Sequence, residues 1–154
     1  MKRPILIAAT MSFLMAASFA AAAHDADHYS AGVPGNAKKP ARTVTVVMSD
    51  GDGSMKFSPD HVDVKKGEQV RFVIRNEGAL KHEFTLASVK DNDKHAEMMQ
   101  KFPDMEHDDP NAKSVDPGKT AEILWRFSKA GTFEFACLIP GHREAGMHGS
   151  VTVK

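Results

Sequence analysis

The side chains best suited to chemistry gather in the last quarter of the chain, between Cys137 and Met147. This segment holds the only cysteine, then His142 after four intervening residues, then Met147 after four more. Thiolate, imidazole and thioether groups are ligands that copper prefers, and two histidines, one cysteine and a weak axial methionine form a recurring electron-transfer copper site. His82, from a distant part of the chain, can supply the second imidazole. We therefore expect one mononuclear type 1 copper site.

Other kinds of site fit these residues less well. A lone cysteine is often only a small buried apolar side chain, and His142 and Met147 would then be ordinary loop residues. A cysteine beside a histidine can also be a nucleophile with its base, but no oxyanion-hole motif or third orienting group stands out. A structural zinc site normally uses several cysteines or histidines at paired spacings, whereas this chain has a single cysteine.

Length and charge narrow the class of protein. The 154 residues suit one domain. A basic start, an apolar run and four alanines predict a secretory signal over residues 1–23 rather than a membrane anchor, because the apolar run is short and ends in alanines. Without this signal the chain keeps 18 basic and 20 acidic side chains, so we expect no nucleic-acid partner and no membrane span.

Export to an oxidising compartment makes the single cysteine informative. One cysteine cannot form an internal disulfide, and an unpaired thiol is a liability there unless it is buried, catalytic or bound to a metal. Cys137 therefore needs an explanation, and a metal site supplies one.

The elements that must position these residues read as short strands. Residues 24–42 are polar and rich in Gly, Pro, Lys and Asp, which predicts a flexible tail. From residue 43 onward, runs rich in β-branched and aromatic residues alternate with turn clusters. The expected strands cover residues 43–48, 55–57, 61–64, 69–75, 82–86, 122–127, 131–137 and 150–153. This spacing predicts an all-β fold, a Greek-key antiparallel β-sandwich over residues 43–154.

One segment breaks this pattern of strands. Residues 92–102 predict a short helical insert, capped by Asp91 or Asn92 and stopped by Pro103.

The predicted strands explain how separated residues can reach one site. Cys137 lies where the 131–137 strand ends, and the turn at Gly141 can fold His142 back beside the sulfur. Met147 then approaches from a third direction, and His82 comes from a strand 55 residues earlier. A site held at two remote points of a rigid sandwich keeps nearly the same shape in both oxidation states, which favours electron transfer.

The segment Phe133-Glu-Phe-Ala-Cys-Leu-Ile-Pro-Gly-His142, followed by Met147-His-Gly149 and a Val-Thr-Val strand, resembles the C-terminal loop of the cupredoxins, the family of azurin and plastocyanin. The Lys65-Lys-Gly-Glu68 turn and Asn76 ahead of His82 resemble the same family, and the similarity covers roughly residues 43–154. The resemblance implies that His82, Cys137 and His142 are equatorial copper ligands and that Met147 is the axial one.

The spacing within this loop differs from that of the best-known members. The plastocyanin loop is shorter before the histidine, and the azurin loop is shorter before the methionine. The binuclear copper domain of terminal oxidases needs a second cysteine in this loop, and residues 138–141 contain none, so that relative is excluded.

A second unusual segment, residues 95–107, holds three methionines and two histidines. His95, Met98, Met99 and Phe102 have the spacing of a helix stripe that covers a sandwich, and methionine is a common gap-filler. Thioether and imidazole groups also suit copper in both oxidation states. The segment resembles the insert of periplasmic copper-tolerance cupredoxins, the CopI group, which favours secondary copper binding. The residues concerned are His95, Met98, Met99, Met105 and His107.

The expected start of the mature chain carries two further histidines, His24 and His28. They resemble the metal-binding tails of the same group, although two histidines among acidic residues also describe an ordinary solvated tail.

Three functions follow from these features. The first is a monomeric periplasmic protein that binds copper and contributes to copper tolerance, which the extra Met/His segments favour. The second is an electron carrier for a redox partner such as a c-type cytochrome or a copper oxidase. The third, a copper enzyme, would need further histidine pairs for a catalytic copper and normally a second domain, so we expect no enzymatic activity.

Overall fold

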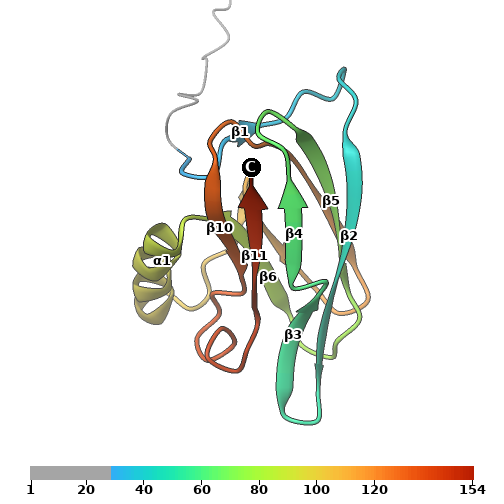
Figure 1. Ribbon diagram of the computed structural model, residues 1–154. Helices are drawn as coiled ribbons and strands as arrows, with labels where there is room; N and C mark the ends of the chain where they lie inside the picture. The colour runs from blue at the N-terminus through green and yellow to red at the C-terminus, as the bar shows by residue number, and fades with distance from the viewer. Residues whose placement is uncertain (1–28) are drawn as a thin grey trace, which may run out of the picture.

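Two β-sheets pack against each other in the computed structural model, which describes residues 29–154 (Figure 1). The first sheet has the strand order β1-β9-β5-β2-β3 and the second has the order β4-β11-β10-β6-β8-β7. The strands of the first sheet are β1 (Val33–Pro34), β2 (Arg42–Gly51), β3 (Ser54–Ser58), β5 (Gln69–Asn76) and β9 (Thr120–Arg126). Those of the second are β4 (His61–Val64), β6 (His82–Ala87), β7 (Asp108–Asp109), β8 (Ala112–Val115), β10 (Gly131–Ala136) and β11 (His148–Val153). The single helix of the described residues is α1 (Val89–Lys101).

The predicted β-sandwich is confirmed, and its sheets are mixed rather than purely antiparallel. β2 pairs with β5 and β4 pairs with β11 in parallel, while the other pairs are antiparallel. The chain crosses to the other sheet between β3 and β4 and returns at β5, which therefore runs in the same direction as β2. A parallel pair needs such a crossover, and the alternation of residue types along a strand does not reveal it.

The two faces of β6 and β10 have different surroundings. Alternate residues of a strand point to opposite faces. Phe84 and Phe135 face the space between the sheets, where their rings stack with centroids 5.1 Å apart. Cys137 lies two positions beyond Phe135 in the same buried cluster, whereas Ala136 belongs to a separate buried cluster with Met99 of α1. One face of this strand pair therefore carries the predicted copper ligands and the other is covered by the helix.

Helix α1 begins earlier than the sequence predicted. Ser88 is the N-cap: its hydroxyl accepts a hydrogen bond from the Asp91 amide at 3.2 Å and donates one to the Asp91 carboxylate at 2.8 Å. This reciprocal arrangement resembles a capping box and fixes the first turn. The predicted cap at Asp91 or Asn92 is therefore wrong. Asn92 is instead buried, and its amide donates to Glu134 at 2.9 Å.

The predicted apolar stripe of this helix is half wrong. Met99 is fully buried against the sheet, but Met98 is 46% exposed and Phe102 is 60% exposed. The buried side of α1 runs instead through Asn92, Ala96 and Met99. The polar Asn92 joins that side because Glu134 accepts its hydrogen bond.

Residues 29–42 are part of the folded sandwich, which corrects the flexible tail expected over residues 24–42. The Tyr29 ring packs edge-on against Trp125 with centroids 5.2 Å apart, and β1 pairs with β9. The Gln69 side chain accepts a hydrogen bond from the Asn36 amide at 2.7 Å. A few such contacts hold a segment whose composition is mostly polar. The remainder of the predicted tail and the predicted signal, residues 1–28, lie outside the described residues.

Strands β1, β7 and β8 were not predicted, because they have only two to four residues and show no run of alternating apolar residues. Within residues 29–154, no helix has the length and apolar composition needed to cross a membrane.

Candidate metal centre

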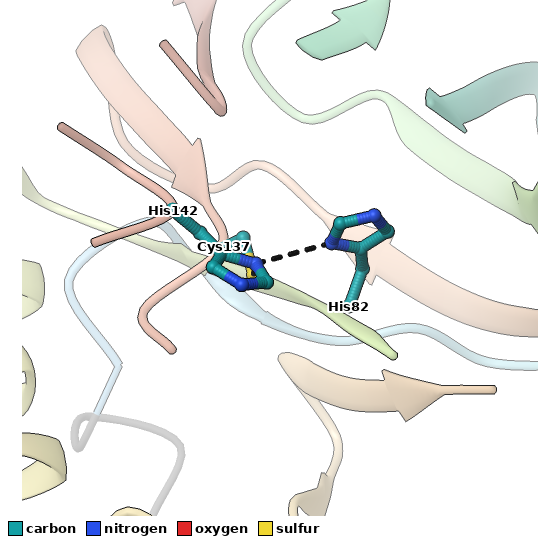
Figure 2. A group of neighbouring side chains, drawn as sticks. All are labelled: His82, Cys137 and His142. Atoms are coloured by element: carbon teal, nitrogen blue, oxygen red, sulfur yellow. Dashed lines mark hydrogen bonds between the residues drawn. The ribbon is translucent and has the colours of Figure 1, made fainter. Parts of the chain in front are cut away.

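Three of the predicted ligands meet at one end of the sandwich. His82, Cys137 and His142 each offer a ligand atom, and these atoms lie within 4.8 Å of one another. The Nδ1 atoms of the two histidines are 3.2 Å apart, and Cys137 Sγ lies 3.3 Å from His142 Nδ1. Figure 2 shows the three side chains converging from different segments of the chain. Two imidazoles and one thiol therefore converge at this end of the sandwich.

A carboxylate orients the first histidine. His82 is fully buried at the start of β6, and its Nε2 lies 2.7 Å from Asp50 Oδ2 at the end of β2. Asp50 also accepts hydrogen bonds from the Ala79 and Leu80 amides, which hold its pKa below the usual value. The ionised carboxylate accepts the Nε2 proton, so the Nδ1 lone pair of His82 faces the other two ligands.

Cys137 lies directly beyond β10, and the structure buries it completely. The amide of Glu83 donates a hydrogen bond to its sulfur at 3.3 Å. Burial raises the pKa of the Cys137 thiol to about 12. Without a metal this thiol stays protonated at neutral pH, and a bound cation would replace the proton and stabilise the thiolate.

The loop between β10 and β11 brings His142 back to the sulfur. Gly141 has a φ of 89°, a left-handed conformation that favours glycine. The His142 amide donates a hydrogen bond to the Ile139 carbonyl at 3.0 Å. In turn the Met147 amide donates to the His142 carbonyl at 3.0 Å. His142 is only half-buried, and partial burial, with the nearby His82, lowers the pKa of its imidazole. Its nitrogen is therefore available to a metal at neutral pH.

Met147 closes the same loop. Its carbonyl accepts the Cys137 amide hydrogen bond at 3.1 Å, and its side chain is fully buried in the cluster that contains Cys137. The backbone of the fourth predicted ligand therefore lies next to the backbone of Cys137.

The donor set fits copper. Two imidazole nitrogens, a thiol and a nearby thioether are soft or borderline donors, whereas magnesium and calcium take oxygen ligands. The two Nδ1 atoms and the sulfur face one point, and Asp50 lies against the far nitrogen of the His82 ring. A cation at that point would bind lone pairs that few hydrogen-bond donors face.

Arg143 fixes the ligand loop to its surroundings. Its guanidinium contacts both carboxylate oxygens of Glu134 at 2.9 Å and reaches Asp93 of α1 at 2.7 Å. The loop is thus tied to both the sheet and the helix. Sequence reasoning missed this role, as well as those of Asp50 and Glu83, because acidic and basic residues in turns and strands carry no local signal of such pairing.

Part of the predicted Met/His segment forms a second cluster. The Nε2 atoms of His95 and His107 are 3.1 Å apart, and His107 Nε2 lies 3.3 Å from Met99 Sδ. Burial lowers the pKa of both histidines. Met105 packs against the buried cluster that contains Met99, but the exposed Met98 does not. The two tail histidines, His24 and His28, lie outside the described residues.

Comparisons with known proteins agree with this geometry. Residues 44–154 match the family model for copper binding proteins of the plastocyanin/azurin family. The chain is 53% identical over 132 residues to a copper-resistant cuproprotein CopI of Rubrivivax gelatinosus, with 86% of this chain and 78% of the relative covered. It is 38% identical to a protein of the same name from Pseudomonas aeruginosa, with 80% and 82% covered.

A solved structure supports the fold. Reduced auracyanin from the photosynthetic bacterium Roseiflexus castenholzii superposes with a TM-score of 0.61 at 20% identity, with 74% of this chain and 99% of auracyanin covered. The family match spans most of the chain and includes all four predicted ligands. The protein is therefore a member of the plastocyanin/azurin family of copper-binding proteins, the cupredoxins, and copper is its cofactor.

Proposed function

We propose that the protein holds one type 1 copper ion through His82, Cys137, His142 and Met147, and that this site serves copper tolerance in the periplasm. The observation that carries the proposal is the convergence of the two histidine nitrogens and the Cys137 sulfur within 4.8 Å. The names of the relatives from Rubrivivax gelatinosus and Pseudomonas aeruginosa, copper-resistant cuproproteins, support the physiological role.

The ligands and the residues that support them have distinct roles in this proposal. Asp50 keeps the His82 Nδ1 lone pair turned inward, and the Glu83 amide donates to the sulfur and so stabilises its thiolate form. Met147, whose side chain is buried in the cluster that contains Cys137, would be the weak axial ligand that tunes the potential. Bound copper supplies one-electron exchange between Cu⁺ and Cu²⁺. Four protein ligands leave no open position for a substrate, so we propose no enzymatic activity.

Export belongs to the same proposal. Residues 1–23 would direct the chain to the periplasm and be removed there, leaving a monomer. His142 is the half-buried ligand and would be the contact point for a redox partner such as a c-type cytochrome or a copper oxidase. A role in copper tolerance requires only that the site bind copper ions or change the oxidation state of those ions.

The proposal is tested by complementing a deletion strain with the wild-type gene and two variants. We expect that His142→Asn fails to restore growth at high copper, because it removes a ligand. The control His148→Asn changes an exposed histidine six residues away and should restore growth fully. Full tolerance with His142→Asn would contradict the role of the site, and lost tolerance with His148→Asn would show that the ligand set is misassigned.

A further inference from the structure

A second group of donor atoms lies under helix α1, on the opposite face of β6 and β10 from the type 1 ligands. His95 and Met99 come from α1, and His107 comes from the segment that leads into β7. Figure 1 shows this helix lying along one side of the sandwich, next to β10. The three side chains meet at His107 Nε2, which lies 3.1 Å from His95 Nε2 and 3.3 Å from Met99 Sδ.

His107 Nε2 cannot hydrogen-bond to all of its neighbours at once. His107 Nε2 has three neighbours with lone pairs, because Glu83 Oε1 lies 3.8 Å away in addition to the two ligand-type atoms. An imidazole nitrogen carries at most one hydrogen and can serve one of them. The His107 side chain is 3% exposed, so water does not reach it freely. A cation would be attracted by several of these lone pairs at once.

Carboxylates surround the cluster in the manner of a metal site. Glu83 is 2% exposed, and its Oε2 atom is buried without a hydrogen-bond partner, while Oε1 receives only a long hydrogen bond from Ser114 at 3.4 Å. On the other side of the ring, Asp109 Oδ2 lies 3.9 Å from His107 Nδ1. This separation is longer than the 2.7 Å between Asp50 and His82, so Asp109 adds negative charge near the ring without a direct hydrogen bond. The buried Oε2 atom of Glu83 has no hydrogen-bond partner among the described residues, and a cation bound at the cluster would compensate its burial.

We propose that His95, Met99 and His107 form a second copper site, which takes Cu⁺. Two imidazoles and a thioether make a soft, three-donor set, which suits monovalent copper better than zinc or a hard divalent cation. Met105 packs against the buried cluster that contains Met99. His95 is only half-buried, so the ion has a short route from the surface. The assignment goes beyond the proposed function and does not depend on the type 1 ligands.

One residue joins the two copper sites. The Glu83 amide donates to the Cys137 sulfur at 3.3 Å, while the Glu83 side chain reaches toward His107 on the other face of the sheet. The two ions would therefore lie back to back across β6. A charge placed at the second site acts on the sulfur through this residue, so loading the second site should shift the visible band of the type 1 centre.

The test is an anaerobic Cu⁺ titration of the exported protein labelled with ¹³C at its methionine methyl groups. We expect two methyl signals to move, one from Met147 and one from Met99, while the signal of the exposed Met98 stays in place. Substitutions to leucine assign these signals, since leucine has nearly the volume of methionine. Met99→Leu should lose one Cu⁺ equivalent and keep the visible band of the Cu²⁺-loaded protein, and Met98→Leu should change neither.

His95→Asn is a second variant that alters a half-buried side chain and should lose the same equivalent. Replacing both His24 and His28 by asparagine removes any copper held by the tail and should leave the Met99 shift unchanged. A Met99 signal that stays fixed while the Met147 signal moves would overturn the second site alone. A Met99 signal that moves while Met147 stays fixed would support the second site and count against the type 1 assignment.

Discussion

At the scale of single residues, the most consequential feature is the carboxylate behind His82. The short contact between Asp50 and His82 Nε2 determines which ring nitrogen is free for copper. Two backbone amides keep Asp50 ionised, so its negative charge lies one imidazole away from the metal position. Such a charge favours Cu²⁺ over Cu⁺, because the more highly charged ion gains more from it.

Replacing Asp50 with asparagine should weaken copper binding and raise the reduction potential. Loss of a carboxylate behind a metal-bound histidine typically reduces metal affinity by about 10- to 100-fold. Competition with a copper chelator measures the affinity, and voltammetry measures the potential.

The matched control is Asp52→Asn, which lies two residues away in the turn after β2 and is exposed to solvent. It should leave the affinity and the potential unchanged. An unchanged potential in Asp50→Asn, or the same shift in both variants, would show that Asp50 does not act on the copper.

The sequence reveals the ligands themselves more readily than their supports. Cys137, His142 and Met147 stand out because their residue types are rare and their spacing is compact. Asp50 lies in a turn cluster beside Asp52, and residue type does not distinguish the two. The partner of Asp50 is 32 residues away, and only the folded chain brings them together.

At the scale of elements, the turn between β5 and β6 positions His82. Asn76 is 1% exposed at the end of β5, and its side-chain amide donates to the carbonyls of Leu80 and Val115, both at 2.8 Å. Its side-chain oxygen accepts the Gly78 amide at 2.9 Å. One side chain therefore holds the turn together and joins it to β8.

Asn76→Ala should lower the free energy of unfolding of the metal-free protein by about 2–4 kcal/mol, because it leaves the buried Val115 carbonyl and the partly buried Leu80 carbonyl without their donor. Urea denaturation measures the change. Glu77→Ala, at the exposed neighbouring position, should change stability by less than about 0.5 kcal/mol. If the two variants lose equal stability, Asn76 does not hold the turn.

Local sequence patterns predict most of the strands but not the features that depend on contacts between distant segments. The eight predicted strands were found close to their predicted positions because alternation of apolar residues reports burial on one face. The helix start at Ser88 was missed, since Ser88, Asp91 and Asn92 are all good caps and only the packing of Asn92 on Glu134 distinguishes them. The parallel pairing of β2 with β5 and the packing of Tyr29 on Trp125 arise from long-range contacts.

At the scale of the whole molecule, the sandwich holds donor atoms on both faces of one strand pair. The type 1 ligands lie between the sheets at the end where the β10–β11 loop turns, and the second cluster lies under α1. Arg143 ties that loop to the helix through Asp93, so both groups of ligands are held in one rigid frame. A rigid frame keeps the ligand positions similar in both oxidation states of copper, which favours rapid electron exchange.

We propose that Cys137 is a thiolate ligand of a type 1 copper. The most direct test adds Cu²⁺ to the metal-free exported protein and follows visible absorbance and total bound copper together. We predict an intense visible band that grows to one copper equivalent and is absent in Cys137→Ala, because the band arises from charge transfer from the thiolate to copper. Copper binding without that band, or a band that persists in Cys137→Ala, would contradict the assignment.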